Sequence, residues 1–211
     1  MKKPTMSKVI KRVPQIRLAV VGLLFLLFYL LLPQPSRANG PTEQVRATVD
    51  KVLAIVRSPN LNPTGQQQDL RVRLAEAINP RFDFVEMAKR SLGSHWGRRT
   101  PKEQREFVKI FAGLLGRSYA GNIESYSSQN VVYTGESENQ NYAQVDTKIV
   151  VENHPPQSIN YKLHSVNNEW KVYDLVIEDI SVVDNYRSQF DRVIARSSFE
   201  ELVRLIEEKQ S

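Results

Sequence analysis

The segment WKVYDLVIEDISVVDNYRSQF, which runs from Trp170 to Phe190, decides how the chain folds. Its first half is a run of aromatic and β-branched residues with the length of a strand. Strict alternation predicts two faces, one with Trp170, Val172, Asp174 and Val176 and the other with Lys171, Tyr173, Leu175 and Ile177. Because both faces carry apolar side chains, the strand belongs inside a layered domain. A helical pattern follows from Ile180, so the chain leaves a sheet and returns as a helix that can pack across it.

The composition is that of a globular protein, because 41% of the 211 residues are hydrophobic and 25% are charged. The pI near 9.5 is typical of nucleic-acid-binding proteins, but the positive charge is concentrated at one end. Seven of the 29 basic residues and no acidic residue precede position 39, which leaves 22 basic against 23 acidic residues in the rest. The body of the chain is therefore near neutral, and we expect no nucleic-acid partner.

The first 38 residues have the three parts of a secretory signal. A basic region ends at Arg17, and an apolar run of 15 residues follows from Leu18 to Leu32, which is shorter than the roughly 20 residues of a membrane-spanning helix. Ser36 and Ala38 place small residues before a cut at Asn39. The sequence thus predicts a cleaved Sec-type signal at 1–38, a single domain at 39–211 and a periplasmic location, with an uncleaved membrane anchor as the alternative.

Helical periodicity predicts four helices, period-two alternation then predicts four strands, and two helices close the chain. The fourth helix has a capping box, with Thr100 as N-cap, Pro101 in the first turn and Glu103 completing the pattern. Short loops between the strands indicate an antiparallel meander. The predicted elements are helices at 42–57, 66–78, 82–92 and 100–126, strands at 130–134, 142–151, 158–166 and 170–177, and helices at 182–196 and 199–209.

This order predicts an α+β domain with N-terminal helices, a four-stranded antiparallel meander sheet and C-terminal helices. The long fourth helix is the natural cover for the concave side of a curved sheet, as in cone-shaped NTF2-like folds with a hydrophobic cavity. Gly113, Gly116 and Gly121 interrupt this helix. Such glycines mark either a close approach to the backbone or tight helix–sheet packing.

Few residues indicate catalytic chemistry. Cysteine is absent, which excludes disulfides and thiol chemistry. His95, His154 and His164 do not have the spacing of metal ligands, so we expect no metal and no cofactor. Asp174 lies in an apolar strand, where burial would raise its pKa. It is either an acid–base group in the cavity of an NTF2-like enzyme or a structural carboxylate bonded to a neighbouring strand or helix end.

Large apolar side chains are abundant for a small α+β core. A helix stripe and a sheet face of this kind can form an ordinary core, or they can line a pocket for an apolar ligand. The residues predicted to line such a pocket are Phe107, Phe111, Leu114, Leu115, Tyr119, Ile123, Val145, Ile149, Ile159, Tyr161, Leu163, Tyr173, Val176, Val183, Tyr186 and Phe190.

Three segments resemble a known family. They are PRFDFVEMAKRSLGSHW (80–96), TPKEQREFVKIFAGLL (100–115) and, most specifically, WKVYDLVIEDISVVDNYRSQF (170–190). The chain resembles the toluene-tolerance family, the periplasmic phospholipid shuttles of the Mla (maintenance of lipid asymmetry) pathway, over about residues 42 to 208. The resemblance implies a non-enzymatic carrier that holds phospholipid tails inside and exchanges lipid with an inner-membrane ABC-type transporter complex and an outer-membrane lipid-handling complex.

Alternatives stay open beside this resemblance. A hopanoid-associated branch of the same family implies a different lipid cargo, and a retained leader would make the protein an anchored structural or assembly protein. A head group left in water needs only a few polar or basic residues at the pocket mouth. The candidates for head-group or partner contact are Arg90, Arg98, Arg99 and Arg187.

Overall fold

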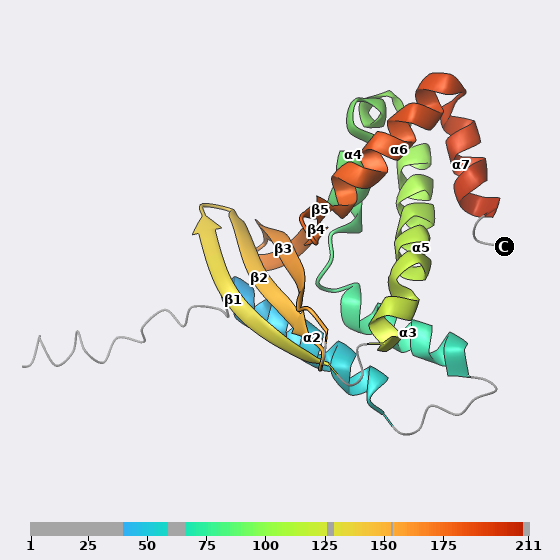
Figure 1. Ribbon diagram of the computed structural model, residues 1–211. Helices are drawn as coiled ribbons and strands as arrows, with labels where there is room; N and C mark the ends of the chain where they lie inside the picture. The colour runs from blue at the N-terminus through green and yellow to red at the C-terminus, as the bar shows by residue number, and fades with distance from the viewer. Residues whose placement is uncertain (1–39, 59–65, 126–128, 153, 209–211) are drawn as a thin grey trace, which may run out of the picture. The chain divides into compact units, whose positions relative to one another are not determined.

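The computed structural model describes residues 40–58, 66–125, 129–152 and 154–208, so the predicted leader lies outside it. The described chain is α+β, as the sequence analysis predicts (Figure 1). None of its helices is both long and apolar enough to cross a membrane. The elements are α2 (Pro41–Val56), α3 (Gln66–Ile78), α4 (Phe84–Leu92), η1 (Gly93–Arg98), α5 (Pro101–Ser125), β1 (Asn130–Asn139), β2 (Tyr142–Val150), β3 (Gln157–Val166), β4 (Glu169–Ile177), β5 (Ile180–Ser181), α6 (Val182–Arg196) and α7 (Phe199–Glu208).

The strands form one antiparallel sheet in the order β1-β2-β3-β4-β5, which confirms the meander. The structure adds a fifth strand that the sequence analysis did not predict. Glu178 and Asp179 both have positive φ, at 47° and 64°, and this conformation closes a tight two-residue hairpin. The hairpin lets Ile180 and Ser181 pair with the end of β4 before α6 begins.

A β-bulge in β4 overturns the two faces that strict alternation predicts. Lys162 pairs with Asp174 and Leu163 pairs with Val172, so Tyr173 is an extra residue opposite a single step of β3. An extra residue reverses the alternation beyond it. Trp170, Val172, Leu175 and Ile177 therefore share one face of the sheet, the inner face. Tyr173, Asp174 and Val176 belong to the outer face.

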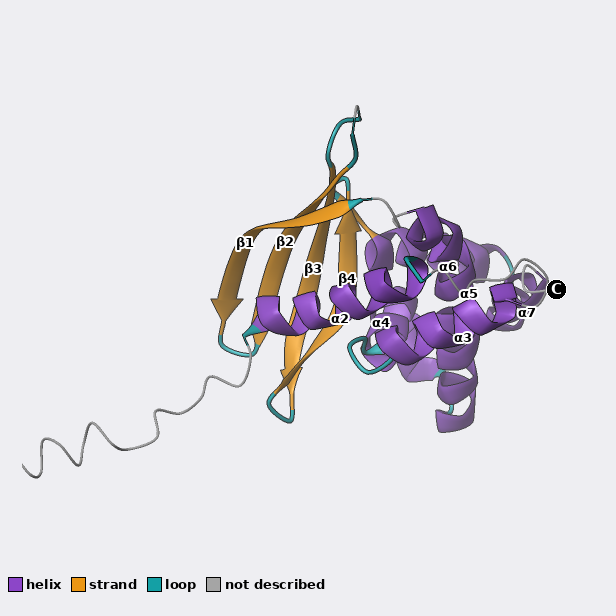
Figure 2. Cartoon of the chain, turned by 90° about the horizontal axis from the view of Figure 1, so that it is seen from below, coloured by secondary structure: helices purple, strands orange, loops and turns teal. Residues whose placement is uncertain are grey.

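Helix α2 covers the inner face, and Figure 2 shows it lying across the strands. Val45 of α2 is buried against Val145, Leu163 and Val172 of the sheet. The Glu136 carboxylate, on β1, accepts a hydrogen bond of 2.8 Å from the Thr42 N–H in the first turn of α2. This contact satisfies a free N–H at the helix start and places negative charge at the positive end of the helix dipole.

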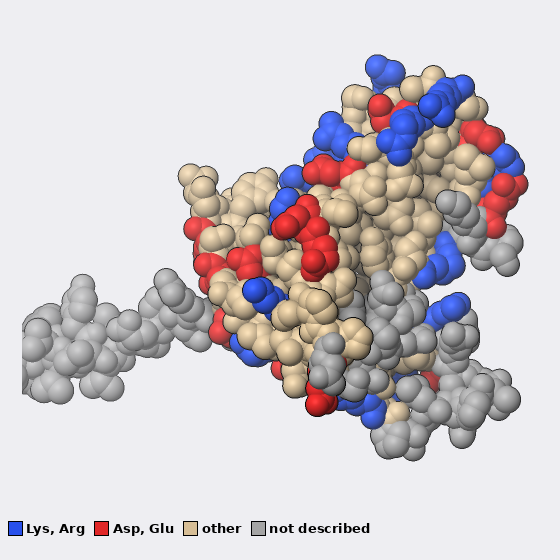
Figure 3. All heavy atoms as spheres, viewed as in Figure 1, with Lys and Arg blue, Asp and Glu red and all other residues tan. Residues whose placement is uncertain are grey.

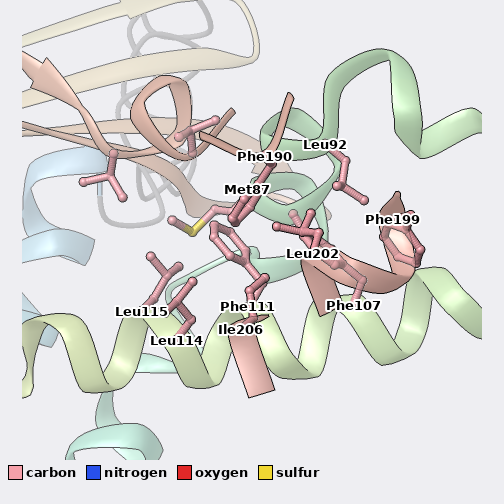
Figure 4. Close-up of a cluster of buried hydrophobic side chains, with 13 residues drawn as sticks. Met87, Leu92, Phe107, Phe111, Leu114, Leu115, Phe190, Phe199, Leu202 and Ile206 are labelled. Atoms are coloured by element: carbon pink, nitrogen blue, oxygen red, sulfur yellow. The ribbon is translucent and has the colours of Figure 1, made fainter. Parts of the chain in front are cut away.

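The other large core lies among α4, α5, α6 and α7 (Figure 4). The rings of Phe107 and Phe111 on α5 stack at 5.9 Å, and Phe190 of α6 packs edge-on against both. The predicted capping box that starts α5 is confirmed, because the Thr100 N–H donates to the Glu103 carboxylate over 2.6 Å and the Glu103 N–H donates to the Thr100 hydroxyl over 3.3 Å.

Asp174 joins the sheet to α6. Its side chain is buried, with 4% of its surface exposed. It accepts hydrogen bonds of 3.0 Å from the Val183 N–H and 2.7 Å from the Ser181 hydroxyl, and the Lys162 ammonium lies 3.6 Å away. This is the structural role that the sequence analysis gave as one of its two interpretations.

We expect Asp174→Asn to destabilise the fold by about 1–3 kcal/mol, because a buried charged acceptor at a helix N-terminus is lost. The free energy of unfolding in urea measures the effect. Asp184→Asn is the matched control, since Asp184 is exposed in the same first turn of α6. Equal stability of Asp174→Asn and the wild type would contradict the anchoring role.

Candidate functional site

A cavity of about 200 Å³ lies between α2 and the inner face of the sheet. We call it the sheet cavity. Alternation along β2 and β3 directs Ile149 and Ile159 inward, where they meet α2 side chains that recur at helical spacing. The lining residues are Val45, Thr48, Val49, Val52, Leu53, Ile78, Arg81, Phe82, Tyr119, Val131, Ile149, Gln157, Ile159, Tyr161, Val172, Leu175 and Ile177.

A second cavity, of about 430 Å³, lies among α3, α4 and α5. We call it the helix cavity. Its floor comes from the start of α4 and from Leu175 of β4, and its sides come from facing stretches of α3 and α5. The lining residues are Arg71, Leu74, Ala75, Ile78, Asn79, Phe82, Phe84, Met87, Ala112, Gly113, Leu115, Gly116, Arg117, Tyr119, Leu175 and Val182.

The two cavities adjoin, because Ile78, Phe82, Tyr119 and Leu175 line both. Phe82 is held at this boundary by the backbone. The Asp83 N–H donates to the Val172 carbonyl and the Val172 N–H donates to the Arg81 carbonyl, each over 2.8 Å. Residues 81–83 therefore run along the part of the β4 edge that β5 does not pair with. Burial raises the pKa of the Tyr119 phenol, as expected where a hydroxyl lies among apolar groups.

Arg81 is a basic residue that borders the sheet cavity, and its guanidinium makes structural contacts. Its guanidinium donates to the Thr48 hydroxyl, to the Gln44 side-chain oxygen and to the Trp170 carbonyl. Burial lowers the pKa of Arg81, although the nearby Glu169 opposes the shift. These contacts fasten α2 to β4, so Arg81 positions the wall of the cavity.

Five of the sixteen residues predicted to line a pocket border one of these cavities: Leu115, Tyr119, Ile149, Ile159 and Tyr161. Most of the others fill the two cores, namely Phe107, Phe111, Leu114, Val183, Tyr186 and Phe190 among the helices and Val145 and Leu163 beneath α2. Tyr173 and Val176 are on the outer face of the sheet. The side chain of Ile123 lies outside the described residues.

None of the four predicted arginines borders a cavity in the described part of the chain. Arg90 bonds Glu86 at 2.8 Å and covers the Tyr173 ring at 4.1 Å. Arg99 lies 3.7 Å from both Glu103 and Glu200 and covers the Phe199 ring. Arg187 packs on Gly93, where a Cβ atom would come within 2.9 Å of its Nε. Arg98 is exposed at the end of η1.

Sequence reasoning missed the contributions of α2, α3 and Arg117. The α2 stripe of Val45, Val49 and Val52 was visible as helical periodicity, but nothing local separates a stripe that fills a core from one that lines a cavity. The glycines of α5 were the better signal, because Gly113 and Gly116 both border the helix cavity.

The arrangement is suited to binding an apolar molecule, and the acid–base candidate from the sequence lies away from it. Asp174, the acid–base candidate, borders neither cavity, and both of its oxygens accept hydrogen bonds. Within the described residues no group of three or more histidine or acidic side chains is placed to hold a metal ion. The geometry therefore does not support the NTF2-like enzyme that the sequence left open.

The model of the family described as "MlaC protein" matches residues 46–208. The chain belongs to the MlaC family. This match covers most of the chain and confirms the resemblance seen in the sequence.

Two curated relatives are similar over most of the chain. The intermembrane phospholipid transport system binding protein MlaC of Haemophilus influenzae is 21% identical over 178 residues, which cover 82% of this chain and 83% of the relative. The toluene tolerance protein ttg2D of Pseudomonas putida is 22% identical over 162 residues, covering 76% and 75%.

A solved structure of this kind is also similar. The phospholipid-binding protein of Ralstonia solanacearum, in complex with a phospholipid, superposes with a TM-score of 0.71 and 30% identity. The match covers 79% of this chain and 94% of that one. The α+β architecture is therefore the one found in a phospholipid-binding relative.

Gly116 offers a test of the helix cavity, because a Cβ added there meets no atom within 4 Å. We expect Gly116→Ala to leave the cavity open and to stabilise the helix by up to about 1 kcal/mol. We expect Gly116→Trp to fold but to fill the space. Titration with an uncharged naphthylamine dye, which fluoresces in apolar surroundings, should then show binding to the wild type and Gly116→Ala and little binding to Gly116→Trp. Equal dye binding by all three would refute the cavity.

Proposed function

We propose that this protein is a phospholipid carrier of the periplasm, the soluble component of an ABC-type lipid transport system. The observation that carries the proposal is the pair of adjoining apolar cavities in a chain of the MlaC family. Their combined volume is in the roughly 300–1,000 Å³ range of ligand pockets. The phospholipid bound to the Ralstonia solanacearum relative supports the same ligand class.

The cavities account for how such a carrier works. Two acyl chains hold about 30 methylenes, and exposing each to water costs about 0.8 kcal/mol, so free transfer would cost on the order of 20 kcal/mol. A protein that keeps the tails buried removes this barrier. We assign one tail to each cavity, with Tyr119 and Phe82 between them, because a branched glycerolipid needs two apolar volumes that meet near one point.

Partners follow from the same energetics. An apolar cavity and a bilayer interior are similar environments for a lipid tail, so the carrier itself supplies no direction. Direction has to come from proteins that consume energy or capture lipid, and we assign these roles to an inner-membrane ABC-type complex and an outer-membrane lipid-handling complex. The relative named for an intermembrane phospholipid transport system supports this assignment.

We expect the wild-type protein, purified without added lipid, to carry phospholipid and to pass it between vesicles. Native mass spectrometry identifies the bound lipid, and a fluorescent phospholipid follows its transfer. Gly116→Trp should carry and transfer much less, while Gly116→Ala should match the wild type. Protein that is lipid-free and accepts no phospholipid from vesicles would defeat the proposal, and a bound hopanoid would replace the cargo while keeping the carrier.

The leader belongs to the same proposal. If residues 1–38 are a cleaved signal and 39–211 form one lipid-binding domain, protein recovered from the periplasmic fraction should begin at Asn39. Intact-mass measurement tests this directly, because the full chain has a mass of 24.2 kDa and the mature chain is lighter by the leader. Recovery of the full-length chain from the membrane fraction would instead support an anchored protein.

A further inference from the structure

Arg117 is a half-buried cation that no described group neutralises. It lies in the second half of α5 and borders the helix cavity. Its Nε and Nη2 atoms are buried and have no hydrogen-bond partner in the described part of the chain. A guanidinium stays protonated in proteins and has no acceptor of its own. Two buried N–H groups without acceptors are unfavourable, so the position is arranged for an acceptor that arrives with a ligand.

The two free donors have the geometry of a fork. Nε–H and Nη2–H lie on the same edge of the planar guanidinium, and two parallel N–H groups are how arginine holds a phosphate or carboxylate. Gly113, one turn earlier on α5, explains how the guanidinium of Arg117 lies against the helix beside the cavity. A Cβ atom at position 113 would lie 3.3 Å from Nη1 and 3.4 Å from Nη2 of Arg117. The absence of that carbon lets the guanidinium lie close against the helix.

The surroundings of Arg117 are positive at the rim and apolar inside. Arg71 of α3 borders the same cavity, and no acidic residue is among the described side chains that line it. No ion pair of Arg71 or Arg117 occurs within the described residues. On the right of Figure 3, basic side chains face each other across the hollow where the lower end of α5 lies above α3. A ligand with an anionic group and long apolar tails matches this distribution.

We propose that Arg117 binds the phosphate of the lipid head group, with its Nε–H and Nη2–H donating to the two non-ester oxygens. Arg71 faces the same phosphate from α3 and adds a second positive charge. This inference rests on the proposed function as a phospholipid carrier and adds the head-group site to it. It makes the protein select tails that are joined to a phosphate over neutral glycerolipids with the same tails.

The test is a competition between two lipids with the same tails, of which only one carries a phosphate in its head group. Wild-type protein is loaded from vesicles that contain equal amounts of dioleoylphosphatidylglycerol and dioleoylglycerol, and native mass spectrometry gives the ratio of the bound species. We expect the wild type to favour the phospholipid. Arg117→Met keeps the aliphatic stem and should lower this preference by about tenfold or more, because hydrogen bonds to a charged group are lost. It should still load dioleoylglycerol, which shows that the cavities are intact.

Two further variants control for charge and for chemistry. Arg105→Met removes the same charge from an exposed position on α5 that borders neither cavity, so it should behave as the wild type. Arg117→Lys keeps the charge without the fork and should restore part of the preference. Inorganic phosphate should not raise the thermal stability of the wild type, because the site binds phosphate only when the tails are held.

The possible outcomes distinguish failure of the carrier from failure of the head-group site. Loading of neither lipid by the wild type would defeat the proposed carrier. An Arg117→Met protein that loads both lipids in the wild-type ratio would overturn the head-group site and leave the carrier standing. Stabilisation by inorganic phosphate that disappears in Arg117→Met would assign the site to a free anion and overturn its assignment to a lipid.

Discussion

The extra residue at Tyr173 in β4 determines what each side of the sheet can do. Strict alternation would place Leu175 and Ile177 on the face away from Val172, and it would put the Asp174 carboxylate on the inner face beside Val172. The bulge brings Leu175 and Ile177 onto the inner face, where both line the sheet cavity. The same shift sends Asp174 to the outer face, where it bonds the first turn of α6. One inserted residue thus sets both the cavity wall and the attachment of the helical layer.

Stability and binding are assigned to different parts of the apolar interior. The rings of Phe107, Phe111 and Phe190 are closely packed, with centroids 5.6–5.9 Å apart, and such packing contributes strongly to folding. The cavities lie beside this core and are left unfilled. Unfilled apolar space forfeits dispersion contacts that an apolar ligand can restore. The fold tolerates this loss of packing energy because the aromatic core and the hydrogen bonds of Asp174 stabilise the elements around the cavities.

Much of the fold can be predicted from local sequence patterns. The capping box at Thr100, the strand periodicity and the Trp170–Phe190 segment predict the α+β order, and the family resemblance rests on the same segments. The bulge could not be predicted from the sequence, because register is a relation between two strands. Nothing inside β4 marks Tyr173 as the extra residue. The fifth strand depends on positive φ at Glu178 and Asp179, a conformation that is uncommon for residues other than glycine.

The site was less predictable than the fold for a related reason. An apolar stripe has the same spacing whether it fills a core, as Phe107 does, or borders a cavity, as Tyr119 does. The four arginines chosen from the sequence are engaged in ion pairs, cover rings or lie at the surface, while Arg117 looked like any basic residue on an amphipathic helix. Its neighbour Gly113 carried the signal, since a glycine one turn before an arginine makes room for a guanidinium against the helix.

A carrier with only apolar cavities would hold a lipid in any orientation that buries the tails. A charged contact at the rim removes that freedom, because reversing or sliding the lipid would separate the phosphate from the guanidinium and bury it among apolar groups, which is strongly unfavourable. The proposed contact at Arg117 would therefore fix the head group at the mouth and the tails inward. A lipid held this way presents its polar end first to a membrane or a partner.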